Sequence, residues 1–200
     1  MNKTGIIVLA AGSSSRFGRP KQILPFQNKT LIQNLTQECV KAGLFPIVII
    51  TGAHAAQVSE AVNNYEAEIL YNKDWVEGMA SGIVAGITKM LDQVVIPEDV
   101  IISVCDQPFL SAELFLQLKN KRSETGKGIV ACTYADTMGT PVLFKNTFFK
   151  ELLELKGEEG AKKLLKLHKA DVATVSFPKG SIDIDTEEDY QNLLKGKHQG

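Results

Sequence analysis

The sequence predicts an α/β fold in which helices cover both faces of a mostly parallel sheet. Short apolar runs rich in β-branched residues alternate with segments of helical periodicity, and this alternation is typical of strand–helix–strand units. Most of the runs are apolar throughout, as expected for parallel strands buried on both faces. The expected strands are Ile6–Leu9, Ile47–Ile50, Glu68–Tyr71, Val100–Val104, Ile129–Thr133 and Val172–Ser176.

Caps and apolar faces identify the helical segments between these strands. The expected helices are Thr30–Ala42, Ala55–Asn63, Ser81–Leu91 and Ala112–Ser123. Thr30 and Gln33 have the spacing of a capping box, and Ser111 is a good N-cap for the fourth helix. Thr186 with Asp189 predicts one more capped helix near the C-terminus. The second half is less regular, but no repeat or linker divides the chain, so we expect one domain over residues 1–200.

Composition excludes several functional classes. The chain has 200 residues and a formal net charge of −1, so nothing in its balance favours nucleic acid as a partner. No apolar run is long enough to span a bilayer, and the apolar N-terminal stretch is too short for a secretory leader. Cys39, Cys105 and Cys132 are widely spaced in apolar surroundings. They predict reduced thiols in a cytoplasmic protein rather than a disulfide framework or a zinc site.

The turn after the first strand, within "GIIVLAAGSSSRFGRPKQILP", is the clearest functional signal. Ligands of open α/β sheets bind beyond the carboxyl ends of the strands. Ala10, Ala11 and Gly12 carry little side chain, so an anion can approach backbone N–H groups there. Arg16 and Lys21 add cationic donors, and the combination suits a triphosphate. The loop matches neither GxxxxGK[ST] nor GxGxxG, and a basic, solvated surface loop is the alternative interpretation.

Six motifs in order carry a resemblance to a known family. They are "LAAGSSSRFGRPK", "YNKDWVEGMASGIVAG", "VCDQPFL", "GTPVLF", "GEEGAKKLL" and "IDIDTEEDY", which together cover most of the chain. The chain resembles nucleotidyltransferases with a Rossmann-like, three-layer α/β/α sandwich of the nucleotide-diphospho-sugar transferase type. Within them it most resembles the molybdenum cofactor cytidylyltransferases and the related accessory proteins of xanthine dehydrogenase-type enzymes.

The resemblance implies Mg²⁺-dependent attack of an acceptor phosphate on the α-phosphate of a nucleoside triphosphate. It makes Arg16 and Lys21 the catalytic cations and Asp106 a catalytic metal ligand. Asp106 follows an apolar strand, where a carboxylate is well placed to hold Mg²⁺. The second metal ligand is Asp185 or Asp183, with Asp185 favoured. These two carboxylates share one face of an extended segment, and a capping cluster for the last helix is the alternative interpretation.

The resemblance also assigns the nucleotide-binding residues, which are expected in the half formed by residues 1–110. They are Leu9, Ala10, Ala11, Gly12, Ser13, Ser14, Arg16, Lys21, Thr51, Gly52, Gly78, Met79 and Ser81. Thr51 and Gly52 are expected to border the nucleobase, and the start of the helix after Gly78 to face the base or ribose. A helix start with small packing residues is the alternative for this last segment. The acceptor is assigned to residues 111–195, where Gly139 and Pro141 match family positions.

The identity of the base depends on Ala11. The guanylyltransferases of the family tend to have glycine at this position, and a methyl group there favours the smaller base of CTP. The expected reaction transfers CMP from CTP to the molybdopterin cofactor and releases pyrophosphate. Alternatives are guanylyl transfer to the same cofactor and a sugar-phosphate or methylerythritol-phosphate nucleotidyltransferase. A non-catalytic cofactor carrier for a molybdenum hydroxylase client is a further alternative. Neither nucleic acid nor membrane is expected as a partner.

Overall fold

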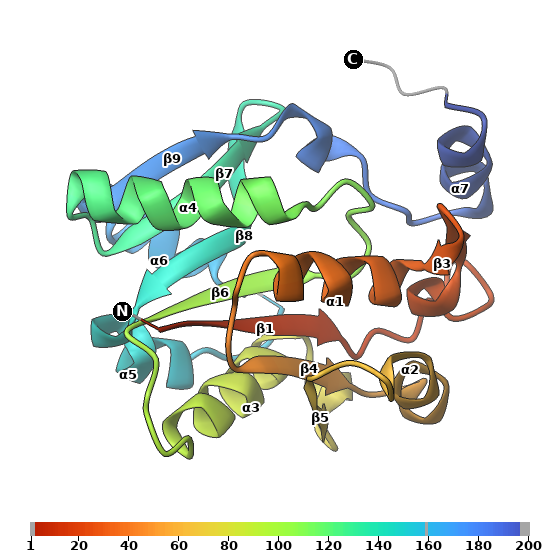
Figure 1. Cartoon of the computed structure of the whole chain (residues 1–200), viewed down its shortest axis with the longest axis horizontal. Helices are drawn as coiled ribbons and strands as arrows, with labels where there is room; N and C mark the ends of the chain where they lie inside the picture. Colours follow the sequence, from red (N-terminus) through yellow and green to blue (C-terminus); the bar gives the residue numbers. More distant parts are fainter. Residues whose placement is uncertain (1–2, 159, 197–200) are drawn as a thin grey trace.

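A seven-stranded mixed sheet separates two layers of helices (Figure 1). The computed structural model describes residues 3–158 and 160–196, so residues 1–2, 159 and 197–200 of the predicted domain lie outside the described residues. The strand order is β5-β4-β1-β6-β8-β7-β9. The strands are β1 (Thr4–Ala10), β4 (Ile47–Thr51), β5 (Glu68–Tyr71), β6 (Asp99–Val104), β7 (Ile129–Tyr134), β8 (Thr137–Lys145) and β9 (Val172–Ser176).

Strand direction brings the polar segments of the sequence to one edge of the sheet. Strands β5, β4, β1 and β6 are parallel to one another, and β7 and β9 are parallel to each other. Strand β8 runs antiparallel to both β6 and β7. The sequence predicted only a short strand around Gly139 and did not predict its direction. Because β1, β4 and β6 end on the same edge, the segments that follow these strands lie close together.

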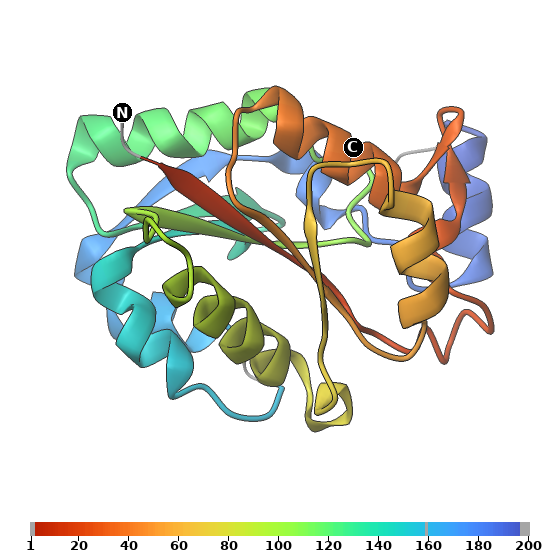
Figure 2. The ribbon, with the colours of Figure 1, turned by 60° about the horizontal axis from the view of Figure 1, so that its bottom comes forward.

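The helices form the two outer layers of the sandwich (Figure 2). Helices α1 (Leu31–Lys41), α2 (Ala55–Val62), α4 (Ala112–Thr125) and α7 (Glu187–Leu194) contribute to one apolar core. Helices α3 (Met79–Leu91), α5 (Phe149–Leu153) and α6 (Lys162–Leu167) contribute to the other. Successive strand residues alternate between the cores, with Ile6 and Val8 in the first and Ile7 in the second. The predicted three-layer α/β/α architecture is confirmed.

Burial is lower at the two edges of the sheet. The inner strands β1, β4 and β6 are buried almost throughout, as predicted for parallel strands. Strands β5 and β9 have only one neighbour each, and exposed residues recur along both. Both runs include polar residues, Glu68 in β5 and Thr174 and Ser176 in β9, so the expectation of burial on both faces, which was made for the continuously apolar runs, does not extend to them.

The predicted caps are present. Thr30 and Gln33 form a complete capping box at α1, Ser111 caps α4, and Thr186 with Asp189 forms the second box at α7. Helix α3 begins at Met79, two residues earlier than predicted. The sequence did not predict the hairpin of β2 (Pro25–Phe26) and β3 (Lys29–Thr30). Short 3-10 helices are η1 (Lys21–Ile23), η2 (Trp75–Glu77), η3 (Asn146–Phe148), η4 (Lys169–Asp171) and η5 (Pro178–Ser181).

Cys39, Cys105 and Cys132 are free and buried. Over residues 3–158 and 160–196, the structure has no helix with the length and apolar character needed to cross a bilayer.

Candidate active site

The loop between β1 and η1 is folded around its own side chains. The Lys21 N–H donates to Ser14 Oγ at 3.1 Å, and the N–H groups of Phe17 and Gly18 both donate to the Ser14 carbonyl at 3.0 Å. The buried Gln22 side chain donates from Nε2 to the carbonyls of Ala10 and Gly12, each at 3.0 Å. The loop therefore has a defined shape without a ligand.

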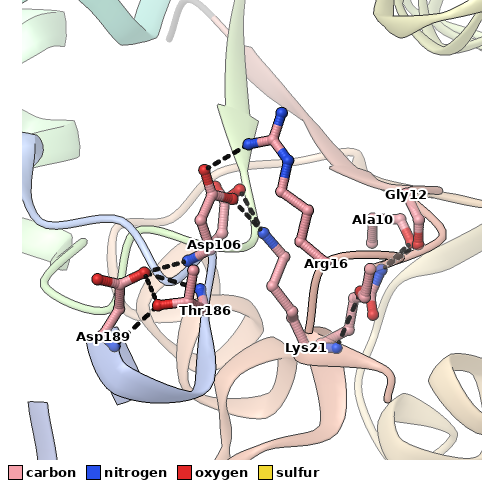
Figure 3. Close-up of polar contacts among 10 residues, drawn as sticks. Ala10, Gly12, Arg16, Lys21, Asp106, Thr186 and Asp189 are labelled. Carbon is pink, nitrogen blue, oxygen red and sulfur yellow. Dashed lines mark hydrogen bonds and ion pairs between the residues drawn. The ribbon is translucent and has the colours of Figure 1, made fainter. Parts of the chain in front are cut away.

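A cluster of opposite charges lies at the carboxyl edge of the sheet (Figure 3). Lys21 Nζ lies 2.8 Å from Asp185 Oδ1 and 3.4 Å from Asp106 Oδ2. Arg16 Nη1 lies 3.7 Å from Asp185 Oδ2. The Lys21 side chain is 17% exposed, whereas that of Arg16 is 80% exposed, so the lysine forms the inner part of the cluster.

The carboxylates decide the charge state of Lys21. Burial lowers the pKa of the lysine, but the hydrogen bond that it donates to Asp185 and the negative charges of Asp106 and Asp185 outweigh burial, so the pKa is raised. For Asp183, burial and the negative charge of Asp106 raise the pKa, which favours the protonated carboxyl group. Lys21 therefore remains an ammonium ion at neutral pH, with two carboxylates beside it.

Asp185 is held in place by the start of α7. Asp189 Oδ2 accepts from the N–H of Asp185 at 3.2 Å and from that of Thr186 at 2.7 Å. The N–H of Ile184 donates to the Asp106 carbonyl at 3.1 Å, which joins this segment to the end of β6. The capping carboxylate is thus Asp189, while that of Asp185 is directed to Lys21 and Arg16. The capping-cluster interpretation therefore does not account for Asp185.

The first cavity lies beside this cluster and has a volume of about 570 Å³. Twelve of the residues assigned from the sequence line it: Leu9, Ala10, Ala11, Gly12, Ser13, Ser14, Arg16, Lys21, Gly78, Met79, Asp106 and Asp185. The wall also includes Gln22, Asn72, Trp75 and Glu158, to which the sequence assigned no binding role. Asn72, Trp75 and Glu158 lie within the quoted motifs, whereas the contacts of Gln22 are revealed by the fold alone.

Three assigned residues lie behind the wall and support it. Thr51 is fully buried and donates from its hydroxyl to the Leu70 carbonyl at 3.3 Å. A Cβ atom at Gly52 would lie 2.5 Å from the Ala11 carbonyl oxygen, so only glycine allows this close approach. Ser81 Oγ accepts from Asn72 Nδ2 and donates to the Gly78 carbonyl, each at 2.8 Å.

A second cavity of about 470 Å³ adjoins the first. Met79, Val104, Asp106 and Glu158 line both cavities. Gly139 and Asp183 line the second cavity, whereas Pro141 is buried in β8 beside the lining residue Thr140. The Gln107 side chain donates to the Gly180 carbonyl at 2.8 Å and accepts from the Thr140 hydroxyl at 3.4 Å, which ties three walls of this cavity together.

The two halves of the chain meet at the start of α3. Gly78 has a φ of 102°, a backbone conformation that L side chains rarely adopt. The N–H of Ala80 donates to the Gly157 carbonyl at 3.0 Å, so the loop before α6 packs on the first turn of α3. Glu158 belongs to this loop and thereby reaches both cavities.

The donor set fits an oxygen-coordinated divalent cation better than a thiolate or imidazole site. Over the described residues, no group of three or more His, Cys, Asp and Glu side chains has the arrangement of a metal site. Asp106 and Asp185 share one ammonium ion, and Mg²⁺ accepts one or two carboxylates with water and phosphate oxygens completing its shell. Cys105 lines the first cavity, but burial raises the pKa of its thiol, which makes it an unsuitable nucleophile.

Three relatives are similar to the chain in sequence. A nicotine blue oxidoreductase of Paenarthrobacter nicotinovorans is 34% identical over 109 residues, which cover 54% of this chain and 51% of the relative. The molybdenum cofactor cytidylyltransferase of Escherichia coli K12 is 23% identical, with 95% of each chain covered. A probable molybdenum cofactor guanylyltransferase of Bacillus cytotoxicus is 24% identical, with 98% and 99% covered.

Solved structures share the fold. Rv0371c of Mycobacterium tuberculosis H37Rv superposes with a TM-score of 0.82 at 25% identity, covering 97% of this chain and 98% of that protein. Its complex with manganese superposes with a TM-score of 0.74 at 24% identity over the same shares of the two chains. The family model described as the MobA-like NTP transferase domain matches residues 6–173. The chain therefore belongs to the MobA-like NTP transferase domain family and is a nucleotidyltransferase.

Proposed function

We propose that the chain transfers CMP from CTP to the terminal phosphate of molybdopterin, giving the cytosine dinucleotide and pyrophosphate. The observation that carries this proposal is the meeting of two cavities at Asp106, with Lys21 and Arg16 on the wall of the first. Two anions have to meet in this reaction. The first cavity, with its cations, provides a place for the triphosphate, and the adjoining second cavity provides a place for the acceptor.

The reaction requires positioning and charge neutralisation rather than a protein nucleophile. A phosphate oxygen of the acceptor forms a bond to the α-phosphorus, and the bond from that phosphorus to the bridging oxygen of the β-phosphate breaks. The electron pair leaves with pyrophosphate. Lys21 and Arg16 bind the β- and γ-phosphates and offset the charge that develops on them, and backbone N–H groups from Gly12 to Ser14 assist.

Asp106 and Asp185 are the residues that would hold Mg²⁺. Both are carboxylates at the carboxyl edge of the sheet, and both already contact the same cation, Lys21 Nζ. When bound, Mg²⁺ supplies charge neutralisation and polarises a phosphate oxygen. Lys21 then exchanges its carboxylate partners for phosphate oxygens. Asp183, on the wall of the second cavity, is assigned to the acceptor side rather than to the metal.

The preference for cytosine rests on the wall around Ala11. Ala11 and Trp75 both line the first cavity, and both contact the hypothetical Cβ position of Gly52 at close range. The wall is therefore held tightly at the Ala11 carbonyl, and we propose that the Ala11 methyl group narrows the space available to a base. A pyrimidine needs less of this space than a purine. Both a cytidylyltransferase and a probable guanylyltransferase are among the relatives, so the base has to be tested.

The second cavity is the proposed acceptor site. Its wall includes Tyr134 and Glu158, which offer an aromatic ring and a hydrogen-bond acceptor to a heterocycle, while Gly139 leaves room for the Tyr134 hydroxyl beside it. Pro141 supports this wall from inside β8. The similarity to an oxidoreductase covers about half of each chain and carries no proposal of redox activity. A molybdenum hydroxylase is the partner that we propose as recipient of the product.

The deciding experiment measures pyrophosphate release with purified protein, Mg²⁺ and molybdopterin, with CTP and GTP in parallel. Release with CTP and little with GTP is the expected result. A preference for GTP would overturn the assignment of the base. Release only with a sugar phosphate or methylerythritol phosphate as acceptor would overturn the acceptor. Asp106→Asn is the control, because it should lose nearly all turnover while its melting temperature remains close to that of the wild type.

A further inference from the structure

Gln22 follows the catalytic cation Lys21 and has a buried side chain with an unusual set of contacts. Its Nε2 donates to the carbonyls of Ala10 and Gly12, both at 3.0 Å. These contacts are drawn at Ala10 and Gly12 in Figure 3. The two carbonyls are on either side of Ala11 in the loop that lines the first cavity. The Gln22 amide thus hydrogen-bonds to two peptide groups of this loop, the ones on either side of the Ala11–Gly12 peptide.

The Ala10 and Gly12 carbonyls determine on which side the nitrogen and the oxygen of the Gln22 amide lie. Within the described residues, Gln22 Oε1 is buried and has no hydrogen-bond partner. Turning the amide over would place this oxygen against two carbonyl oxygens, so the nitrogen has to face the loop. A buried acceptor without a partner lowers stability. The position of Gln22 is therefore better explained by what it does to the loop than by a contribution to the core.

Holding the carbonyls orients the N–H groups of the same peptides. In a planar trans peptide the C=O of one residue and the N–H of the next point in opposite directions. When the carbonyls of Ala10 and Gly12 face Gln22, the N–H groups of Ala11 and Ser13 point away from it. Both residues line the first cavity. These are the donors that an anion approaching the loop would use.

We infer that Gln22 is a positioning residue for the nucleotide, which holds the carbonyls of Ala10 and Gly12 so that the N–H groups of Ala11 and Ser13 are presented to phosphate. The inference rests on the proposed function, because it takes the first cavity as the triphosphate site. It adds a residue that makes no contact with substrate and acts through the backbone. The loop is thereby shaped before the nucleotide arrives, which lowers the entropic cost of binding.

The test compares two variants with a matched control. Gln22→Met keeps the length of the side chain and removes both donors, and Gln22→Glu replaces the donating group by a carboxylate oxygen. The control is Gln33→Met, because Gln33 Nε2 also donates to a backbone carbonyl, that of Ala61 at 2.9 Å, and lies outside both cavity walls. The probes are CTP and inorganic pyrophosphate, whose binding is measured by titration calorimetry in the presence of Mg²⁺.

Gln22→Met should weaken the binding of both probes by about ten-fold, because the loop would then have to be ordered when the ligand binds. Gln22→Glu should weaken binding further. KM for CTP should rise while kcat and KM for the acceptor stay within about two-fold. Amide hydrogens of residues 9–20 should exchange faster in Gln22→Met than in the wild type. The melting temperature of Gln22→Met should stay near the wild-type value, because the orphaned acceptor is removed with the donors. Gln33→Met should lose thermal stability and keep wild-type affinity for both probes.

Wild-type affinity for both probes in Gln22→Met would overturn the inference. So would recovery of wild-type affinity on cooling, because it would show that the variant is only less well folded. These outcomes are separable from those of the proposed function. A wild-type protein whose pyrophosphate binding weakens in Gln22→Met, but which uses neither CTP nor GTP, would overturn the proposed function and support the positioning role. A wild-type protein that binds neither probe would overturn both.

Discussion

Lys21 Nζ lies 2.8 Å from Oδ1 of Asp185, although the two residues are 164 positions apart in the sequence. The same nitrogen lies 3.4 Å from Oδ2 of Asp106. The ammonium ion therefore occupies the place between two carboxylates where a divalent cation would find its oxygen ligands. In this state the lysine offsets the repulsion of the two acids, and the loop that carries it is joined to both ends of the site.

Lys21→Met should separate two roles of the lysine, which are to neutralise the two carboxylates and to bind the triphosphate. Without the ammonium ion, the carboxylates of Asp106 and Asp185 lose their cation, so Mn²⁺ should bind the nucleotide-free variant more tightly than the wild type. Turnover should nevertheless fall by about 100-fold or more in kcat/KM, because the triphosphate loses a charged donor. Calorimetric titration with Mn²⁺ and steady-state pyrophosphate release check the two expectations.

Lys89→Met is the matched control for this prediction. Lys89 forms a 2.8 Å ion pair with Glu68 on the surface, outside the walls of both cavities. It should change neither Mn²⁺ affinity nor turnover. Unchanged or weaker Mn²⁺ binding in Lys21→Met would contradict the idea that lysine and metal share the same carboxylates.

Asp185→Asn and Asp183→Asn should have different kinetic effects. Asp185 lines the first cavity and contacts Lys21 and Arg16, so its variant should lose metal affinity and raise KM for CTP. Asp183 lines only the second of the two cavities, so its variant should mainly raise KM for the acceptor. Each effect should be about ten-fold or greater, as for a lost charged hydrogen bond. Initial-rate measurements with each substrate varied in turn check this, and the reverse pattern would exchange the two assignments.

The sequence was sufficient to predict the sheet strands β1, β4, β5 and β6 and the capping box of α1 in the first half, but not the β2–β3 hairpin. Apolar runs and caps are local patterns, and parallel strands bring the segments after β1 and β6 to one edge whatever their separation in sequence. The division of labour between Asp183 and Asp185 was not predictable. Alternation places both on one face of an extended segment, but only the packing of α7 and Asp189 decides which carboxylate reaches Lys21.

The contacts of Gln22 and Thr51 were not predictable for a different reason. The role of Gln22 depends on its hydrogen bonds to the Ala10 and Gly12 carbonyls, which its residue type and spacing do not indicate. Thr51 was expected to follow a strand, yet it is the last residue of β4, and its buried hydroxyl donates to the Leu70 carbonyl of the neighbouring strand. Local sequence patterns do not predict the contacts that a site makes between segments far apart in the sequence.

Ala11→Gly should broaden the choice of base. Removing the methyl group widens the first cavity. The kcat/KM for GTP relative to that for CTP should therefore rise by about ten-fold, as expected for one methylene in a pocket. Competitive pyrophosphate release with mixed nucleotides checks the ratio. Ala53→Gly controls for added backbone flexibility, because the N–H of Ala53 donates to the Ala11 carbonyl while its side chain is exposed outside the cavity. An equal shift in both variants would contradict a steric role for Ala11.

Arg122→Met should destabilise the protein in a pH-dependent way. Arg122 Nε lies 3.3 Å from Asp99 Oδ1, and both side chains are largely buried. Burial raises the pKa of Asp99, although the charge of Arg122 opposes the rise. Because the pKa of Asp99 is higher in the folded state than in the unfolded state, the free energy of unfolding falls as the pH rises from the unfolded-state pKa to the folded-state pKa. Without Arg122 the pKa of Asp99 rises further, and the fall in stability extends to higher pH.

The loss in unfolding free energy for Arg122→Met should therefore be about 3 kcal/mol near pH 7, where Asp99 would be an uncompensated buried charge, and smaller near pH 4. Urea unfolding of variant and wild type at the two pH values measures the difference. Adding Asp99→Asn to Arg122→Met should restore most of the loss at pH 7, because the double variant buries no charge at this position. Equal losses at both pH values, with no recovery in the double variant, would assign the effect to packing of the arginine stem instead of to its charge.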